Sequence, residues 1–163
     1  ATPNNLPQQI TSFIGREHEL AEVRRLLGTA RLVTLLGTGG IGKTRLALQA
    51  AAELIDDYPD GVWLVELAPL SDERLVAQAV ASVVGVQEEA GRPVIEALLK
   101  YVADRRVLLI LDNCEHLVRA CAELAEQLLR SGPDVKILAS SREHLHSAAE
   151  VASTPVEVKV MVG

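Results

Sequence analysis

The sequence predicts an α/β fold in which a parallel β-sheet is covered by helices on both faces. Short apolar runs alternate along the chain with segments whose apolar residues recur at helical spacing. Strands that alternate with helices in this way are typical of parallel sheets. The most hydrophobic run, residues 107–111, is apolar throughout, which indicates a central strand buried on both faces.

Five segments are expected to be strands, because each is a short apolar or alternating run bounded by turn residues. Residues 32–36 and 62–67 are nearly continuous apolar runs, as is the central segment 107–111. Residues 135–141 follow the turn Ser-Gly-Pro-Asp. Residues 156–160 read Val-Glu-Val-Lys-Val, and this alternation indicates the last strand of the sheet.

Five helices are expected around these strands, each from apolar residues at helical spacing. They cover about 16–27, 43–55, 71–84, 92–103 and 115–130. Gly28 is a plausible C-cap of the first helix, and Ser71 is a plausible N-cap of the third. Pro93 lies early in the fourth, where proline is tolerated. The polar residues 1–12, with two prolines, are expected to form an extended leading segment.

Composition narrows the class of protein. The 163 residues are enough for one domain with its own core, and 48% hydrophobic but only 2% aromatic residues imply an aliphatic core. A net charge of −6 argues against nucleic-acid binding by this chain, because such domains usually carry a basic surface. No apolar stretch approaches the about 20 residues that cross a bilayer. No signal-peptide pattern and no initiating Met are present, so we expect a cytoplasmic segment of a longer protein.

The two cysteines, Cys114 and Cys121, are too few for a disulfide framework. Together with four scattered histidines they show no metal-ligand spacing. We interpret both as small buried apolar residues with reduced thiols, which agrees with a cytoplasmic location.

Residues 37–44 carry the most specific motif in the chain. They fit G-x-x-x-x-G-K-[ST], the phosphate-binding loop of nucleoside triphosphatases, between an expected strand and an expected helix. Main-chain N–H groups of such a loop and the helix N-terminus attract phosphate, and glycines let the backbone approach it closely. Lys43 would reach the β- and γ-phosphates, and Thr44 would hold Mg²⁺. The alternative is a glycine-rich turn without a ligand.

The expected nucleotide contacts in this loop are Gly37, Thr38, Gly39, Gly40, Ile41, Gly42, Lys43, Thr44 and Arg45. Ligands of open parallel sheets bind at the carboxyl ends of the strands, and two further groups are expected there. Asp112 ends the central strand, at the Walker B position of a magnesium-bound carboxylate. Arg142 follows the strand at 135–141. The alternatives are a helix N-cap for Asp112 and a surface cation for Arg142.

Hydrolysis needs a group that orients or deprotonates water. Many ATPases of this type place a second acid directly after the Walker B aspartate, but here that residue is Asn113, whose amide cannot act as a base. Glu115 is a candidate substitute and, equally, a first-turn acid of the next helix. Glu66, at the end of the second strand, is a weaker candidate. We therefore predict slow turnover.

Four segments resemble the signal-transduction ATPases with numerous domains, the STAND ATPases. Residues 13–19, Phe-Ile-Gly-Arg-Glu-His-Glu, resemble their hhGRExE signature, and residues 36–44 resemble their Walker A. Residues 108–116 resemble their Walker B, and Leu-Ala-Ser-Ser-Arg at 138–142 resembles their sensor 1 strand. The amino-terminal part is similar to the start of the nucleotide-binding domain in bacterial AfsR-like and LuxR-type large regulators, the NB-ARC-related branch.

The resemblance implies a P-loop NTPase three-layer α/β/α sandwich with a five-stranded, mainly parallel sheet, here one domain over residues 1–163 of a longer regulator. It implies ATP or ADP with Mg²⁺ as cofactors and a switch in which ADP holds a closed form and ATP releases it, often with self-association. The implied roles are adenine and ribose contact for Ile14, Gly15 and Arg16; phosphate and metal binding for Lys43 and Thr44; metal support for Asp112; and γ-phosphate sensing for Arg142.

Two departures from that family matter. The helical and winged-helix domains that normally follow the last strand are missing from this sequence, so we expect weaker nucleotide affinity. DNA-binding and sensor domains are missing too, so nucleic-acid contact and transcription control are implied by the resemblance alone, through other domains. Two alternatives stay open: a P-loop enzyme with steady turnover, such as a kinase, and a scaffold that has lost nucleotide affinity.

Overall fold

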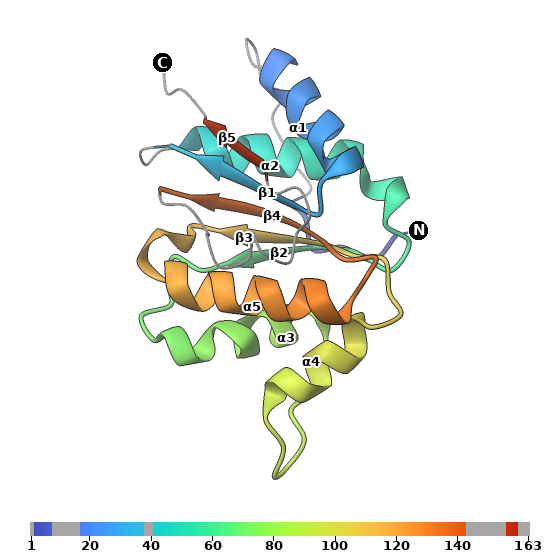
Figure 1. The fold of residues 1–163 in the computed structure, drawn as a ribbon, viewed down its shortest axis with the longest axis vertical. Coiled ribbons are helices and arrows are strands. Elements are labelled where there is room, and N and C mark those ends of the chain that lie inside the picture. Colours follow the sequence, from blue (N-terminus) through green and yellow to red (C-terminus); the bar gives the residue numbers. More distant parts are fainter. Residues whose placement is uncertain (1, 8–16, 38–40, 143–155, 160–163) are drawn as a thin grey trace.

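A computed structural model describes residues 2–7, 17–37, 41–142 and 156–159, the side chains of Ile41 and of 156–159 excepted. The strands form one sheet in the order β2-β3-β4-β1-β5, and every pairing in it is parallel (Figure 1). Their bounds are β1 Leu32–Leu36, β2 Val62–Glu66, β3 Leu108–Asp112, β4 Lys136–Ser141 and β5 Val156–Lys159. The α/β fold with a parallel sheet is therefore confirmed.

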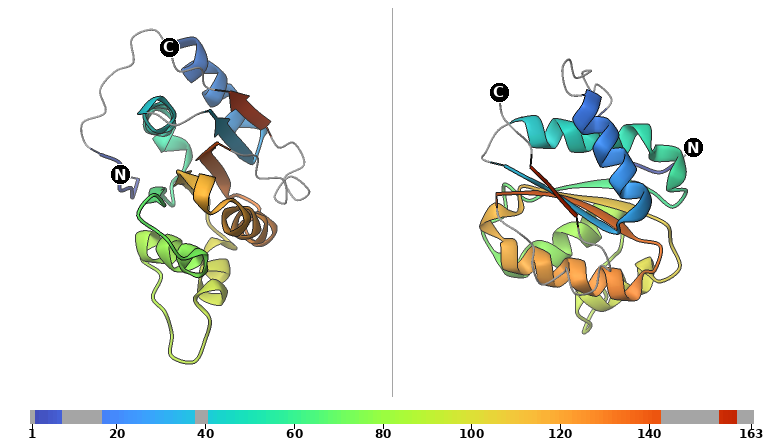
Figure 2. Two further views of the ribbon diagram at one scale, coloured as in Figure 1. Left: turned by 90° about the vertical axis from the view of Figure 1, so that its left-hand side faces the viewer. Right: turned by 45° about the horizontal axis from the view of Figure 1, so that its top comes forward.

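Helices cover both faces of this sheet. They are α1 Glu17–Thr29, α2 Ile41–Glu53, α3 Val76–Val84, α4 Val94–Val102 and α5 Val118–Ser131. The right-hand view of Figure 2 shows α1 and α2 over one face and α3, α4 and α5 over the other. Short 3₁₀ turns, η1 Ile55–Asp57, η2 Glu73–Leu75 and η3 Cys114–His116, precede or connect these elements.

The two faces of β3 explain why its sequence is apolar throughout. Leu108 and Ile110 belong to the core cluster shared with α1 and α2, whereas Leu109 and Leu111 belong to the cluster shared with α3, α4 and α5. All four side chains are fully buried. Successive strand residues point to opposite faces, so a strand between two helical layers needs apolar residues at every position.

Two expected helix caps were wrong. Gly28 lies inside α1, which continues to Thr29, so Gly28 is not a C-cap. Ser71 is not an N-cap; instead the Asp72 carboxylate accepts a hydrogen bond of 2.9 Å from the main-chain N–H of Arg74. That cap starts the 3₁₀ turn η2, and α3 begins only at residue 76.

The helix expected over 115–130 is in two parts, η3 and α5. They are separated at Leu117, whose φ of −135° and ψ of 31° are not helical. Asn113, directly before η3, adopts the left-handed conformation with φ 63° and turns the chain after β3. Asn is one of the few residues other than Gly that enter this region readily.

The leading segment lies along the outer edge of β2. Val62 donates its main-chain N–H to the Pro3 carbonyl at 3.0 Å. The Asn5 side-chain amide donates to the Leu64 carbonyl at 2.9 Å and accepts from the Leu64 N–H at 2.6 Å. An amide side chain thus replaces a strand partner, which covers polar groups that would otherwise leave an open sheet edge. Within the described residues, no helix combines the length and apolarity needed to span a bilayer.

Candidate functional site

The carboxyl ends of three neighbouring strands, β3, β4 and β1, form the candidate site. The register places Leu36 opposite Ser141, and Glu66 of β2 opposite Asp112, so these strands end at one level. The main-chain N–H of Gly37 donates to the Ser141 carbonyl at 3.3 Å, which ties the start of the phosphate loop to the end of β4. Polar residues that follow separate strands are thereby brought to one edge.

Lys43 is buried at this edge, in the first turn of α2. Its side chain is only 3% exposed, and Nζ donates to the Gly37 carbonyl at 2.6 Å. An ammonium group has three N–H donors, so this bond leaves donors for phosphate oxygens. Burial strengthens any such contact, because water screens it less. Gly42 and Arg45 lie in the same first turn of the helix.

Thr44 and Asp112 lie in direct contact, although they are far apart in sequence. The Thr44 hydroxyl lies 2.9 Å from Oδ1 and 3.1 Å from Oδ2 of Asp112. The Asp112 carboxylate is 4% exposed and is the last residue of β3, so it is not a helix N-cap.

A hydroxyl and a carboxylate are hard oxygen ligands, which suit Mg²⁺. The described residues contain no group of three or more His, Cys, Asp or Glu that could hold a metal alone. The pair therefore fits a magnesium ion that takes its other ligands from phosphate and water.

Ser140 is a site residue that our sequence analysis did not single out. Its hydroxyl donates to Asp112 Oδ1 at 2.7 Å and accepts the main-chain N–H of Asn113 at 2.9 Å. Its side chain is 1% exposed. In the sequence, the signal for this site residue was the pair of serines, Ser140 and Ser141, that ends an otherwise apolar strand.

The turn after Asp112 carries the other candidates for hydrolysis. Asn113 directs its amide Nδ2 to Asp112 Oδ2, at 3.3 Å. Glu115 Oε1 lies 3.9 Å from Arg142 Nε, and Glu115 Oε2 is buried without a hydrogen-bond partner among the described residues. The Arg142 side chain is 59% exposed. Glu115 and Arg142 are thus brought together, at a distance too long for a strong bond.

The weaker candidate, Glu66, and the neighbouring His116 lie apart from these contacts. The Glu66 side chain is exposed, although its main chain is in register with Asp112. The His116 ring nitrogen Nε2 lies 2.8 Å from the Leu70 carbonyl, which ties it to the loop after β2. Six expected contact residues lie outside the described part of the chain: Ile14, Gly15, Arg16, Thr38, Gly39 and Gly40. Only the backbone of Ile41 is described.

The cysteines lie next to the site without facing solvent. Both are buried and free. Cys114 Sγ lies 3.4 Å from the Leu111 carbonyl. A hydrogen bond with the Cys121 thiol, together with burial, holds the pKa of Cys114 well above its usual value. The interpretation of both cysteines as small buried residues is confirmed.

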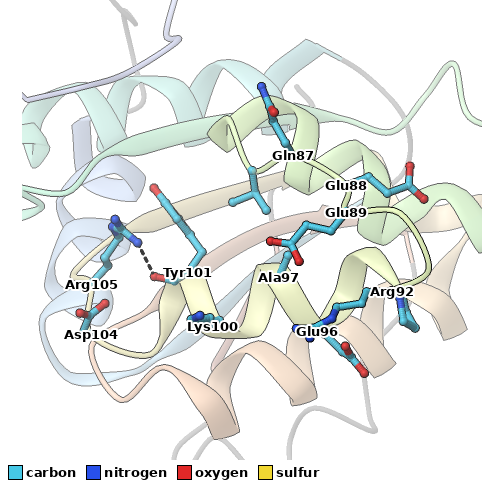
Figure 3. A pocket seen from close by; sticks show the side chains of 12 residues that line it. Gln87, Glu88, Glu89, Arg92, Glu96, Ala97, Lys100, Tyr101, Asp104 and Arg105 are labelled. Carbon is cyan, nitrogen blue, oxygen red and sulfur yellow. Dashed lines mark hydrogen bonds between the residues drawn. The ribbon is translucent and has the colours of Figure 1, made fainter.

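A hollow of about 580 Å³ lies elsewhere, between α4 and the loop that precedes it (Figure 3). Its walls come from residues 86–105 and include none of the expected nucleotide contacts. Tyr101 lies at one end, where the Arg105 guanidinium sits 4.2 Å from the centre of its ring. Both acidic and basic side chains line it (Figure 3). This mixed charge does not match a triphosphate.

The sequence was compared with known families and proteins. The family described as AAA domain matches residues 24–146. An uncharacterised Mycobacterium tuberculosis protein is 43% identical over 144 residues, which are 88% of this chain and 37% of that protein. A protein of the same organism, named as an HTH-type transcriptional regulator, is 46% identical over 79% of this chain and 14% of its own length. Regulatory protein AfsR of Streptomyces griseus is 29% identical over 86% of this chain and 15% of its own length.

Solved structures agree on the fold. A Pyrococcus horikoshii STAND protein with a tetratricopeptide repeat sensor has a TM-score of 0.64 at 16% identity, over 94% of this chain and 24% of that protein. The P-loop NTPase type of α/β fold is therefore confirmed. The chain spans 37% or less of the length of the mycobacterial relatives described above.

Proposed function

We propose that this chain, which belongs to the AAA domain family, binds ATP or ADP with Mg²⁺ and serves as a slowly hydrolysing nucleotide switch. One observation carries the proposal. Lys43, Thr44 and Asp112 meet at the carboxyl edge of the sheet, and Lys43 and Asp112 are almost fully buried there. Burying an ammonium and a carboxylate is costly, so their presence at this edge indicates a ligand that uses them.

Each residue has a separate role in this proposal. The phosphate loop and Lys43 bind the phosphates, and the main-chain tie between Gly37 and Ser141 holds the loop on the sheet. Thr44 and Asp112 would hold Mg²⁺, which supplies charge neutralisation at the β- and γ-phosphates. Arg142, mostly exposed after β4, is free to approach a γ-phosphate.

Slow hydrolysis follows from the turn after Asp112. Asn113 lacks a basic group, and its left-handed backbone directs its amide toward Asp112. Water activation would therefore fall to Glu115. A steadily working ATPase is the second candidate, and it is favoured by the Glu115 Oε2 atom beside Arg142, which is buried and has no hydrogen-bond partner in the described part of the chain.

The relatives suggest where such a switch operates. Some carry names of transcriptional regulators, and each extends well beyond the matched region. We therefore place the chain in a bacterial transcription regulator, in the NB-ARC-related branch, with other domains of the same protein as partners. Nucleic-acid contact through other domains of the longer protein, a cytoplasmic location, nucleotide-dependent self-association and adenine contact by Ile14, Gly15 and Arg16 belong to this proposal.

The decisive experiment is a time course of ADP formation after the protein is mixed with Mg-ATP, followed over several enzyme equivalents. Little product, or one equivalent that stays bound, supports the switch. Sustained turnover near ~1 per second or above favours the working ATPase. Lys43→Ala is the control for contaminating activity, and failure of the wild type to bind either nucleotide would overturn both candidates.

A further inference from the structure

We propose that Ser140 is a positioning residue that joins the metal-binding carboxylate of Asp112 to the turn that carries Glu115; this rests on the proposed nucleotide function. Ser140 lies in β4, Asp112 ends β3, and Glu115 lies in η3. One buried hydroxyl contacts both the carboxylate and the first main-chain N–H of the turn.

The chemistry of the two partners fixes the direction of the hydroxyl proton. An ionised carboxylate only accepts hydrogen bonds, and a main-chain N–H only donates them. The Ser140 hydroxyl must therefore donate to Asp112 Oδ1 and accept from Asn113. Because Ser140 is only 1% exposed, water does not compete for either hydrogen bond. Thr44 of α2 also contacts the carboxylate, so residues of two elements hold the orientation of Asp112.

The Ser140 hydroxyl also lies where the main-chain pairing between β3 and β4 ends. The last registered pair of the two strands is Leu111 with Ala139. Beyond it, the Asn113 N–H bonds to the side chain of Ser140 instead of a strand carbonyl, and Asn113 takes the left-handed conformation. The chain then enters η3, which brings Glu115 to 3.9 Å from Arg142.

Two consequences of removing this hydroxyl can be measured independently. The first concerns metal: carboxylate ligands are oriented by hydrogen-bonding partners, whose loss typically weakens metal affinity about 10- to 100-fold. The second concerns the turn itself. Cys114 follows Asn113 directly and is fully buried, so its reaction with a thiol reagent reports how often the turn opens.

The test uses three variants beside the wild type. Ser140→Ala removes the hydroxyl, and Ser140→Thr keeps it in a side chain suited to a strand. Thr34→Val is the matched control, because it removes a buried hydroxyl from β1, where Thr34 is 2% exposed and in register with Ala139. Nucleotide affinity is measured with Mg²⁺ and with a chelator. Cys114 labelling is followed by mass spectrometry without nucleotide.

We expect Ser140→Ala to lose roughly 10-fold in Mg²⁺-dependent affinity, with affinity in chelator unchanged within about twofold. Its Cys114 should be labelled several-fold faster. Ser140→Thr and Thr34→Val should match the wild type in both measurements. Equal loss with and without Mg²⁺, an unchanged labelling rate, or the same effects in Thr34→Val would overturn the inference. If the wild type binds no nucleotide, the proposed function fails, and the labelling rates alone decide the role of Ser140.

Discussion

The polar side chains at the two ends of the strands differ in what they bond to. At the amino ends, Arg31 donates from Nη2 to the carbonyls of Leu129 and Gly132, at 2.8 and 2.6 Å, and Lys136 donates to the Leu27 carbonyl. These acceptors lie near the carboxyl ends of helices, where carbonyls lack partners within the helix. The basic side chains thus cap α5 and α1.

At the carboxyl ends, side chains bond mainly to one another. Asp112 is the common acceptor of Thr44 and Ser140, and each bond joins two different elements. A ligand can replace hydrogen bonds between side chains without breaking the main-chain hydrogen bonds between strands. The comparison suggests that the amino edge serves stability and the carboxyl edge serves binding. Lys43 and Ser140 are exceptions at the carboxyl edge, because Lys43 donates to the Gly37 carbonyl and Ser140 accepts the main-chain N–H of Asn113.

The largest expected effect is therefore at Lys43. Lys43→Ala should lower Mg-nucleotide affinity by at least ~100-fold, because a buried charged contact to phosphate is lost. Titration calorimetry would measure it, with Lys100→Ala as control, since Lys100 is exposed on α4. If the Lys43 variant bound Mg-nucleotide with wild-type affinity, the assignment of this edge as the nucleotide site would be wrong.

The amino edge should show the opposite pattern. Arg31→Ala should lower the free energy of unfolding by about 2 kcal/mol, because two carbonyls lose a charged donor. Nucleotide affinity at a temperature where the variant is folded should not change. Arg130→Ala is the control: it removes an exposed arginine of α5 that pairs only with Glu126 among the contacts of the described chain, so its cost should stay below ~0.5 kcal/mol. A loss of binding in the Arg31 variant would contradict the division between the edges.

Replacing Asp112 tests whether this carboxylate holds the metal at the carboxyl edge. Asp112→Ala should weaken nucleotide binding roughly 10-fold in Mg²⁺ and much less in chelator. Glu66→Ala is the matched control, because it removes an exposed carboxylate in register with Asp112 on the neighbouring strand. Equal losses under both conditions would make Asp112 a structural residue.

The smallest expected effect concerns Asn113. Asn113→Asp should not raise turnover beyond about twofold, because the side chain at this position faces the Asp112 carboxylate. It should cost roughly 1 kcal/mol of stability without Mg²⁺, from repulsion between adjacent carboxylates, and less with Mg²⁺ bound. Urea unfolding with and without Mg²⁺ measures both changes in the free energy of unfolding. A large increase in turnover would show that the amide alone limits hydrolysis. Asn113→Gly is the backbone control, since Gly also accepts a positive φ.

Most of the fold was predictable, because hydrophobic periodicity and turn residues are local signals. The predicted strands correspond to β1–β5 within one residue or so, and α2 and α4 were expected within two residues. The errors at Gly28, Ser71 and the start of α5 lie where a cap or a left-handed residue competes with helical periodicity. The outcome of this competition can depend on a single side-chain hydrogen bond, which the composition of the sequence does not reveal.

The sequence by itself determined the phosphate loop, the Walker B carboxylate and the alternation that makes a parallel sheet, because each depends on residues close together in the chain. The tertiary structure decided that Ser140 and Thr44 hold Asp112, that the Asn113 amide faces Asp112, and that Glu115 lies beside Arg142. The Ser140 contact joins β4 to β3 across 28 positions, and the Thr44 contact joins α2 to β3 across 68 positions, so both depend on strand register. Register follows from how all the buried faces pack together, and no short segment carries that information.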